Sequence, residues 1–544
     1  NRMKDIVKYN INYTTETINK YECSKISLEQ QICILKAPDT VEEKAMIKLK
    51  ELKGYPAEFG AKIKQYLEGL VRIPFGKYRE EPILTTIKSI NTDFKKIKNF
   101  ITKFFDMNDT DKTKYTLLEI IYMNKNYKTL LEKRILTLLL EQICKMPLYV
   151  LNVLINLLFN NKNTKKSLLK NNKSNKILEI TNYINGLKSI DYSLLYEIST
   201  AISSLNHCQE YITNAKNIIN VETNITEFHN ETTKIEEALE NSIYSHHHAK
   251  KQIMKIIGQW INGEQSGYCF GFEGSPGIGK TRLAKKGLTN CLCNHDGTTR
   301  PFIFIALGGS SNGSSLEGHG YTYVNSTWGK IVDILMETKC MNPIIYIDEL
   351  DKVSNTENGK EIIGILTHLI DPTQNDSFQD KYFTGIDIDI SKALFIFSYN
   401  DADLIDKILL DRIHRIKFEN LSLEDKMVII HKYIIPEINT KMGFDNVVDI
   451  DDSIIQHIIT SYTSEPGVRK LKEIMFDLYG EINLELLKIN ENLENSIPIK
   501  VTLENLENKY LTKYQKITEK KIYGEHRIGI INGLWANSLG LGGI

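Results

Sequence analysis

The sequence predicts a multidomain protein in which an α/β nucleotide-binding domain with a parallel sheet lies between helical regions. The segment Gly274-Ser-Pro-Gly-Ile-Gly-Lys280-Thr281 fits the phosphate-binding pattern G-x-x-x-x-G-K-[ST] without a mismatch. Short apolar runs alternate with helical stretches from 253 to 418, which is typical of parallel strands joined by crossover helices. Apolar residues at helical spacing precede and follow this part. We therefore expect the chain to bind a nucleoside triphosphate.

The phosphate-binding segment lies between an apolar run, 268–272, and a stretch that opens a helix at Arg282. Glycines let the backbone curve so that its N–H groups point at phosphate oxygens, and a helix N-terminus adds partial positive charge. Lys280 is expected to neutralise the β- and γ-phosphates, and the Thr281 hydroxyl to bind Mg²⁺. A glycine turn that binds nothing is the alternative, and the flanking strand and helix argue against it. The residues expected to contact the nucleotide here are Gly274, Ser275, Pro276, Gly277, Ile278, Gly279, Lys280 and Thr281.

A second nucleotide signature is the apolar run 344–347, which is followed by Asp348 and Glu349. In an open α/β sheet, ligands bind at the carboxyl ends of the strands. We expect Asp348 to hold Mg²⁺ together with Thr281, and Glu349 to orient or deprotonate the attacking water. A solvated strand end is the alternative. The position of the pair, about 70 residues after the phosphate-binding segment, favours the catalytic interpretation.

Composition excludes several classes of protein. The 68 basic and 68 acidic residues cancel, so no net field draws the chain to nucleic acid or to an anionic membrane. The longest apolar run, 148–159, is too short to span a bilayer. Eight cysteines without a C-x-x-C pair indicate reduced thiols. The Asn/Lys-rich stretch 160–176 is expected to be a solvated loop, with a basic nucleic-acid-binding patch as the alternative.

The motifs and their order resemble the AAA+ ATPase module of the Lon family of ATP-dependent proteases. The resemblance covers the phosphate-binding segment, Asp348-Glu-Leu-Asp-Lys352 and the stretch Ile370–Tyr382. In that family an apolar strand ends in a polar sensor 1 residue, and here the strand 393–399 ends in Asn400. These matches imply an ATPase that uses ATP and Mg²⁺.

Two arginines match later motifs of the family. Leu409-Leu-Asp-Arg412-Ile is similar to L-L-D-R-M, whose arginine reaches the γ-phosphate bound by the neighbouring subunit. Tyr462–Arg469 resembles the lid motif Y-T-x-E-A-G-V-R, which makes Arg469 the sensor 2 candidate. A permanently charged, planar guanidinium suits the stabilisation of a transferred phosphoryl group. A surface ion pair is the alternative for each arginine. A finger that acts across a subunit boundary implies a ring, and the family forms hexamers.

The resemblance also suggests contacts with substrate and base. Gly318-His-Gly-Tyr-Thr-Tyr323-Val324 is similar to the family's substrate-gripping pore loop, so Tyr323 and Val324 are expected to contact the translocating chain. A buried tyrosine in an ordinary loop is the alternative. The family's H-Y-G motif carries a tyrosine that packs on adenine; this chain reads His246-His247-His248, and we expect His247 to stack in its place. Consecutive helical residues point 100° apart, which argues against a metal site in this triplet.

The resemblance divides the chain into four parts. Residues 1–245 are expected to form a helical N-terminal region with an insertion at about 86–230, and residues 246–420 the α/β AAA+ domain. Residues 421–520 are expected to form an all-α lid, which opens at a capping box, Ser422-Leu-Glu-Asp425. Residues 521–544 resemble the start of the Lon peptidase domain. The chain begins at Asn1 rather than Met and stops on Leu541-Gly-Gly-Ile544, so both ends look cut. The family's Ser–Lys dyad lies beyond this point, and no peptidase residue is assigned.

The function predicted is ATP hydrolysis that drives unfolding and translocation of unfolded or damaged proteins, as the motor of a Lon-type serine protease. A nucleic-acid remodelling ATPase on the same AAA+ scaffold is the alternative from another class. A regulatory scaffold that binds nucleotide without turnover is a third, against which the intact Asp348-Glu349 pair argues. The expected partners are protein substrates and further copies in a hexameric ring, without membrane or nucleic acid. The expected location is cytoplasmic, or the mitochondrial matrix if a targeting segment was removed.

Overall fold

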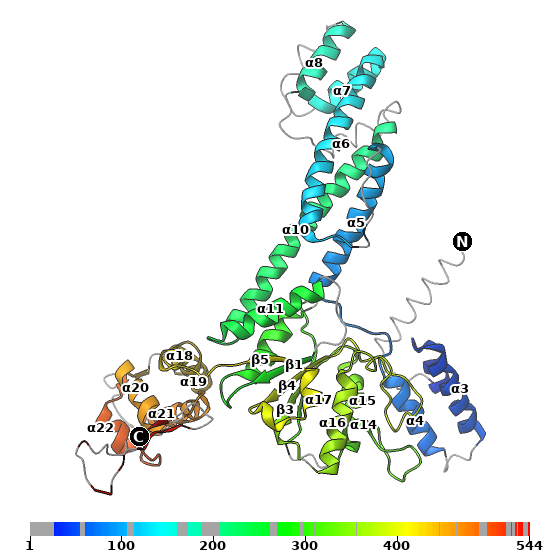
Figure 1. Ribbon diagram of the computed structural model, residues 1–544. Coiled ribbons are helices and arrows are strands. Elements are labelled where there is room, and N and C mark those ends of the chain that lie inside the picture. The colour runs from blue at the N-terminus through cyan, green and yellow to red at the C-terminus, as the bar shows by residue number, and fades with distance from the viewer. Residues whose placement is uncertain are drawn as a thin grey trace. The chain divides into compact units, whose positions relative to one another are not determined.

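The computed structural model divides the chain into two compact units (Figure 1). The first, here called the nucleotide-binding unit, combines Asn1–Glu80 with Ile235–Ile544; the second, the helical unit, is Glu81–Lys234. This grouping places residues 1–80 with the α/β domain, whereas the sequence suggested one helical region over 1–245. The structure describes residues 27–54, 60–105, 112, 114–159, 172–185, 206–261, 269–293, 297–308, 312–354, 356–444, 447–463, 465–488, 498–517, 524, 528–529, 531, 533–536 and 542–543.

A parallel five-stranded sheet forms the centre of the nucleotide-binding unit, in the order β2-β3-β4-β1-β5. The sheet confirms the expected α/β class. Its central strands are apolar along their length because a parallel sheet is covered on both faces. Every residue of β4 is buried, as are the first four residues of β1 and of β3. The strands are β1 (Cys269–Glu273), β2 (Phe302–Ala306), β3 (Ile344–Asp348), β4 (Leu394–Tyr399) and β5 (His414–Lys417).

Helices cover both faces of this sheet. On one face, buried residues of α15 and α16 share a core with Ile345, Ile347 and Phe397. On the other face, Trp260 of α11 contacts Phe270 of β1, with ring centroids 6.3 Å apart. The helices of this domain are α11 (His247–Ile261), α12 (Lys280–Arg282), the π-helical η4 (Leu283–Leu288), α13 (Thr289–Cys291), α14 (Ser314–Glu317), α15 (Lys330–Thr338), α16 (Glu357–Ile370) and α17 (Lys407–Asp411), with short 3₁₀ turns η5 (Leu350–Lys352) and η6 (Ala402–Leu404).

Three N-terminal helices share the same core. Buried residues of α3 and α4, among them Val41, Leu49 and Leu67, belong to one hydrophobic cluster with Phe383 and the sheet. Figure 1 shows these helices beside α14 and α15. The N-terminal helices are therefore part of the α/β domain in packing terms. Their bounds are α2 (Leu28–Ile34), α3 (Asp39–Gly54) and α4 (Ala61–Arg72).

The lid has a hydrophobic core of its own, which includes Ile455, Leu471 and Leu478. The expected capping box is confirmed: Ser422 Oγ accepts a hydrogen bond from Asp425 N at 3.1 Å, and the Asp425 carboxylate accepts one from Ser422 N at 3.2 Å. The elements of the lid are α18 (Leu423–Ile429), η7 (Ile430–Ile434), α19 (Ile435–Met442), β6 (Val448–Asp449), α20 (Asp452–Tyr462), α21 (Arg469–Lys488), β7 (Ile499–Lys500), α22 (Leu503–Asn505) and η9 (Leu506–Tyr510).

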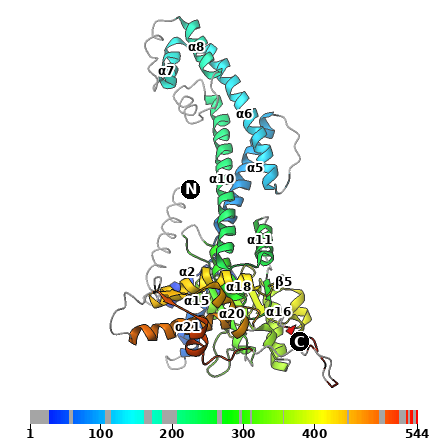
Figure 2. The same cartoon turned by 90° about the vertical axis from the view of Figure 1, so that its left-hand side faces the viewer.

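The helical unit contains long helices that lie side by side, as both views show (Figure 2). Asn124 Nδ2 donates to Ile218 O at 3.2 Å and Lys128 pairs with Glu222 at 2.8 Å, which ties α6 to α10. No helix among the residues that the structure describes has the length and apolar character to cross a membrane. The helices are α5 (Pro82–Phe105), α6 (Leu117–Lys145), α7 (Leu148–Phe159), α8 (Lys173–Asn185) and α10 (Asn206–Ser242), which continues into the other unit.

The structure describes only parts of two segments for which the sequence made a prediction, 160–176 and 521–544. Residues 173–176 of the expected loop 160–176 begin α8, because Ile177 and Ile180 continue the apolar spacing of a helix; residues 160–171 lie outside the described residues. Most of 521–544 also lies outside them, apart from the short antiparallel pair β8 (Trp535–Ala536) and β9 (Gly542–Gly543).

Candidate nucleotide-binding site

The phosphate-binding segment connects β1 to α12 through three glycines with positive φ. Gly274 has φ 153°, Gly277 φ 79° and Gly279 φ 103°, values that side chains with a Cβ rarely adopt. A Cβ on Gly274 would also lie 2.9 Å from the backbone oxygen of Phe418. The loop therefore has its curvature because glycines stand at these three positions, and its last residue leads directly into the helix that begins at Lys280.

Lys280 lies at the carboxyl edge of the sheet and is only 8% exposed. Its Nζ donates hydrogen bonds to the backbone oxygen of Tyr399 and to Asn400 Oδ1, both at 2.9 Å, and to the backbone oxygen of Gly274. Burial lowers the pKa of Lys280 to about 8, although the carboxylates of Asp348 and Asp351 oppose this shift. The structure thus brings Lys280 and Asn400 together, as the resemblance implied.

The two carboxylates follow β3. Asp348 Oδ1 accepts a hydrogen bond from Glu349 N at 3.0 Å, and Glu349 Oε1 pairs with Lys352 Nζ at 2.5 Å. Glu349 has φ 60°, the left-handed region, which redirects its side chain at the end of the strand. A Cβ on Gly308, after β2, would lie 1.9 Å from Glu349 Oε2. A side chain at position 308 would therefore displace the Glu349 carboxylate, the end of a flexible side chain. Sequence reasoning missed Gly308 because a single glycine after a strand carries no motif.

The proposed Mg²⁺ ligands are chemically suited to the ion, because Mg²⁺ prefers oxygen donors from hydroxyl and carboxylate groups. The Thr281 hydroxyl lies 3.1 Å from the hydroxyl of Tyr346 on β3, the strand that ends at Asp348. Both candidate ligands thus come from neighbouring positions at the carboxyl edge of the sheet. Among the described residues, no group of three or more His, Cys, Asp or Glu is arranged to hold a metal ion. The His246–His248 triplet is therefore not such a group.

The two arginines lie in different surroundings. Arg412 Nε and Nη2 donate to Asp371 Oδ2 at 3.2 and 3.1 Å, and hydrogen bonds from Thr373, followed by the contribution of Arg412, lower the pKa of Asp371. Arg469 is the first residue of α21 and lies beside the phosphate-binding segment. A Cβ built on Gly277 would lie 3.1 Å from the Cβ of Arg469. The structure therefore brings Arg469 to the nucleotide loop of its own chain and holds Arg412 on Asp371.

The lid touches the phosphate-binding segment through main-chain atoms. Val468 N donates to the backbone oxygen of Gly277 at 3.1 Å. A Cβ on Gly467 would lie 2.4 Å from the carbonyl carbon of Gly277, so only glycine permits this approach. The contact brings the Tyr462–Arg469 stretch, whose Ser464 lies outside the described residues, against the loop.

A pocket beside the loop is suited to a nucleobase because aromatic and aliphatic groups line it. Tyr244 and Ile243 lie directly before α11, and Tyr433 comes from the lid, where its ring is 5.0 Å from the Arg282 guanidinium. The residues around this pocket are Ile243, Tyr244, Gly277, Ile278, Gly279, Arg282, Leu421, Ile429, Tyr433, Ile434, Glu437, Val468 and Lys472.

His247 does not line this pocket, which corrects the placement expected from the sequence. Its side chain is 81% exposed and its Nδ1 lies 3.6 Å from Glu240 Oε1, because the first turn of α11 directs it outward. The buried histidine is His246, whose Nε2 donates to the backbone oxygen of Ile278 at 2.9 Å. Burial lowers the pKa of His246, and the hydrogen bond to Ile278 opposes this shift.

Tyr244 is the pocket residue that sequence reasoning missed. The signal was present, because Ile243-Tyr244-Ser245 retains the tyrosine of the H-Y-G pattern. Ser245 has φ 62° at the position of the glycine in that pattern, which explains why glycine suits it. The substitution of serine for glycine and of isoleucine for histidine hid the motif.

Residues 318–329, here called the pore-loop segment, present Tyr323 and Val324 at the surface. Tyr323 is 69% and Val324 88% exposed. Exposure on this scale disagrees with the alternative of a buried tyrosine in an ordinary loop. The tip is therefore available for contact with another chain.

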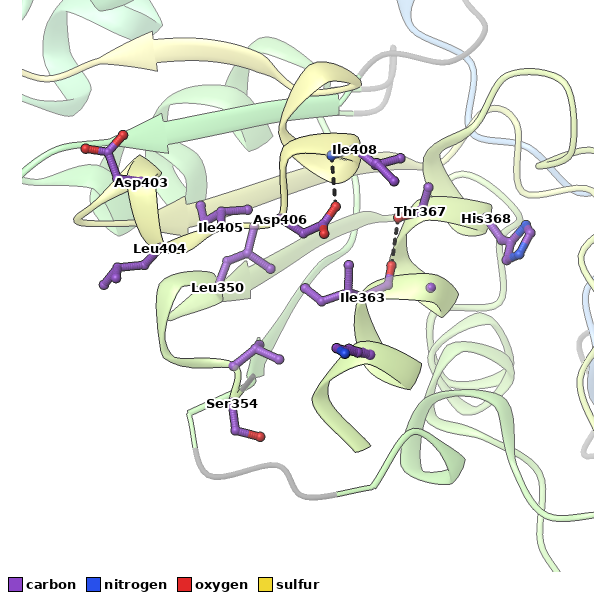
Figure 3. A pocket seen from close by; sticks show the side chains of 13 residues that line it. Leu350, Ser354, Ile363, Thr367, His368, Asp403, Leu404, Ile405, Asp406 and Ile408 are labelled. Carbon is purple, nitrogen blue, oxygen red and sulfur yellow. Dashed lines mark hydrogen bonds between the residues drawn. The ribbon is translucent and has the colours of Figure 1, made fainter. Parts of the chain in front are cut away.

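A groove lies near the ion pair of Arg412 and Asp371, between η5, α16, η6 and α17 (Figure 3). Asp406 caps α17 by accepting a hydrogen bond from Ile408 N at 2.8 Å. Two apolar side chains at the groove are more than half exposed, Leu404 at 61% and Ile408 at 62%. Such apolar exposure is typical of a surface that another protein covers.

Comparison with known proteins gives the class. Residues 270–421 match the family described as ATPase family associated with various cellular activities (AAA). The nucleotide-binding unit thus carries an AAA ATPase domain, which implies nucleotide binding.

Several curated proteins that are similar to this chain are named Lon protease. The chain is 33% identical over 385 residues to a Lon protease homolog of Acanthamoeba polyphaga mimivirus, an alignment that covers 61% of this chain and 37% of that protein. It is 37% identical over 269 residues to the Lon protease of Campylobacter jejuni (49% and 32% covered), and 32% identical over 268 residues to a mitochondrial Lon protease homolog of Candida glabrata (49% and 25%). Over about half of its length the chain is therefore similar to Lon proteases, and it carries the AAA ATPase domain. It spans about a third of the length of the curated relatives that it matches.

Proposed function

We propose that the chain hydrolyses ATP in order to unfold and translocate protein substrates, as the motor part of a Lon-type ATP-dependent serine protease. The observation that carries this proposal is the grouping of Lys280, Asn400 and the Asp348-Glu349 pair at one edge of the sheet. Relatives named Lon protease support the coupling of this ATPase to proteolysis.

In the proposed mechanism the nucleotide lies between the phosphate-binding segment and the lid. The N–H groups of the loop and Lys280 bind the phosphates, while Tyr244 stacks on the base. Thr281 and Asp348 would hold Mg²⁺, which supplies charge neutralisation on the phosphate oxygens. Asn400 orients the attacking water, and Glu349 accepts its proton as the oxygen attacks the γ-phosphorus. The ion pair of Lys352 Nζ with Glu349 Oε1, at 2.5 Å, helps to orient this carboxylate.

Arg412 and Arg469 are proposed to stabilise the charge on the transferred phosphoryl group. Arg469 acts from the lid of the same chain. Arg412 acts on the nucleotide of a neighbouring subunit, after exchanging Asp371 for a phosphate oxygen. The groove lined by Leu404 and Ile408 lies close to Arg412, and its exposed apolar side chains are suited to contact the neighbouring subunit. We propose that copies of the chain assemble into a hexameric ring.

The energy of hydrolysis is proposed to pull polypeptide through the pore-loop segment. An aromatic face at Tyr323 followed by an aliphatic side chain at Val324 packs against almost any side chain, so it grips unfolded or damaged proteins without sequence preference. The Ser–Lys dyad of the parent protease is assigned to no residue of this chain. A cytoplasmic location also stays a proposal; two relatives are named mitochondrial.

The test compares the ATPase rate with unfolded casein and with DNA. Stimulation by casein supports the proposal, and stimulation by DNA alone would refute it in favour of a nucleic-acid remodelling ATPase. If the protein binds ATP tightly but hydrolyses it neither with casein nor with DNA, the result would indicate a regulatory scaffold. Tyr323→Ala should weaken the casein response, measured as a raised KM for casein. The matched control is Tyr149→Ala, at an exposed tyrosine of α7 in the helical unit.

A further inference from the structure

The pore-loop segment rests on helix α4 of the N-terminal part of the chain, more than 240 residues away in sequence. Lys62 Nζ donates a hydrogen bond to the backbone oxygen of Tyr323 at 2.6 Å, and the two residues are 261 positions apart. Lys62 Nζ also lies 5.0 Å from the ring centroid of Tyr321. One cation of α4 thus contacts both the gripping residue and the aromatic residue two positions before it.

Aromatic packing extends this contact. The ring of Tyr66, 5% exposed, meets Tyr321 edge-on with centroids 5.3 Å apart. The same ring lies 5.1 Å from Phe383, which stacks on Trp328 at 6.1 Å and 19°. Tyr321 and Trp328 therefore anchor the two arms of the pore-loop segment in one aromatic cluster, while Tyr323 between them stays exposed.

The fit between α4 and this cluster leaves no spare space. A Cβ on Gly69 would lie 2.8 Å from Trp328 Cζ3 and 3.0 Å from Phe383 Cζ. Both contacts are with rigid rings, so even one methyl group would force Trp328 or Phe383 to move. Helix α4 is thus shaped to the base of the loop.

The ends of the pore-loop segment are held separately. Gly329 N donates to Asp380 Oδ2 at 2.8 Å, and Tyr382 N donates to Asp380 Oδ1 at 2.8 Å. His319 N donates to the backbone oxygen of Thr327 at 3.1 Å, which closes the two arms on each other. Between these ends the loop is held by the contacts from α4, together with Lys48 of α3, whose Nζ lies 5.3 Å from the centroid of the Tyr321 ring.

We propose that helix α4 braces the pore loop, with Lys62 and Gly69 as positioning residues that hold Tyr323 and Trp328 in place when substrate is pulled. The inference rests on the proposed function, in which Tyr323 grips the substrate. When substrate is pulled, the contacts from α4 keep the pore-loop segment from moving, so that ATP hydrolysis moves the substrate instead of the loop. It predicts a weaker grip, with unchanged ATP chemistry, when the contacts from α4 are removed.

The first test uses Lys62→Met in the full-length protein, with ATPase rate measured against casein concentration. Loss of a charge-assisted hydrogen bond should raise the KM for casein about threefold to tenfold, while the basal ATPase rate and the maximal stimulated rate stay unchanged. Lys62→Arg should restore the KM. Lys64→Met is the matched control, because Lys64 lies on the same helix and pairs with Glu68 at 3.7 Å. Equal KM values in Lys62→Met and Lys64→Met would overturn the brace.

The second test uses Gly69→Ala, with Gly54→Ala at the end of α3 as its control, since a Cβ there meets nothing within 4 Å. Gly69→Ala should raise the KM for casein and shift the fluorescence of Trp328, which reports the ring's displacement. Gly54→Ala should change neither. Identical emission spectra and KM values for the two variants would show that α4 does not constrain the loop.

Tyr323→Ala separates the brace from the proposed function. A raised KM in Tyr323→Ala, together with wild-type values in Lys62→Met and Gly69→Ala, would overturn the brace alone. An unchanged KM in Tyr323→Ala would overturn the grip assigned to this residue, and with it the brace.

Discussion

The nucleotide site and the helical unit use their residues in different ways. At the site, Gly274 and Gly277 are required because a side chain there would meet a neighbour or strain the backbone. In the helical unit, α5 buries apolar residues at every third or fourth position, such as Ile90, Phe94 and Ile97, and any apolar residues of similar volume meet that demand. Chemistry therefore prescribes residue identity in one region, whereas packing prescribes only polarity and size in the other.

The strongest test of this contrast is Glu349→Gln. The substitution keeps shape but removes the base, so turnover should fall about 10²- to 10⁴-fold, while ATP affinity stays the same. Phosphate release and the binding of a fluorescent ATP analogue measure the two effects. Glu357→Gln, an exposed carboxylate in the first turn of α16, is the control and should retain full turnover. Unchanged turnover in Glu349→Gln would remove the assigned base.

The counterpart in the helical unit is Phe94→Ala. Phe94 is fully buried and contacts the rings of Tyr115 and Tyr127, so its truncation should cost about 3–5 kcal/mol of unfolding free energy. Denaturant unfolding followed by circular dichroism measures the loss, and the exposed neighbour substitution Lys95→Ala should cost little. ATP affinity should not change. A large loss of ATP affinity in Phe94→Ala would erase the contrast between the two regions.

A smaller effect is expected at the base pocket. Tyr244→Ala should weaken ATP binding about tenfold, since base stacking on an aromatic ring contributes about 1–3 kcal/mol. His247→Ala should leave the affinity unchanged because this side chain points into solvent. The reverse result, a loss in His247→Ala alone, would restore the placement expected from the sequence.

ATP affinity is also expected to depend on pH, with little change near neutral pH. The pKa of Lys280 is lowered to about 8 by burial, so the unliganded site loses its cation as pH rises through that value. Protonated Lys280 is the form that binds phosphate, so ATP affinity should be constant below pH 8. Above it, affinity should decrease by up to about tenfold per pH unit. Lys280→Arg removes the titration and should flatten the profile. A flat profile for the unmodified protein between pH 7 and 9.5 would contradict this prediction.

The same contrast explains how much could be predicted. The phosphate-binding segment and Asp348-Glu349 were recognisable because their chemistry allows few alternatives, and the α/β class followed from apolar runs that a parallel sheet requires. The association of α3 and α4 with the sheet domain could not be predicted, because helical spacing shows which face is buried and not what covers it. Tyr244 was missed because its neighbours had diverged from the pattern, and Gly308 because its constraint comes from a residue 41 positions away.

The joint between the lid and the phosphate-binding segment has a consequence for evolution. It includes the Val468–Gly277 main-chain hydrogen bond and the contact at Gly467, where main-chain atoms of the two segments meet. Substitutions of lid side chains leave this hydrogen bond in place as long as Gly277 and Gly467 persist. We therefore expect these two glycines to vary less among related sequences than the side chains around them.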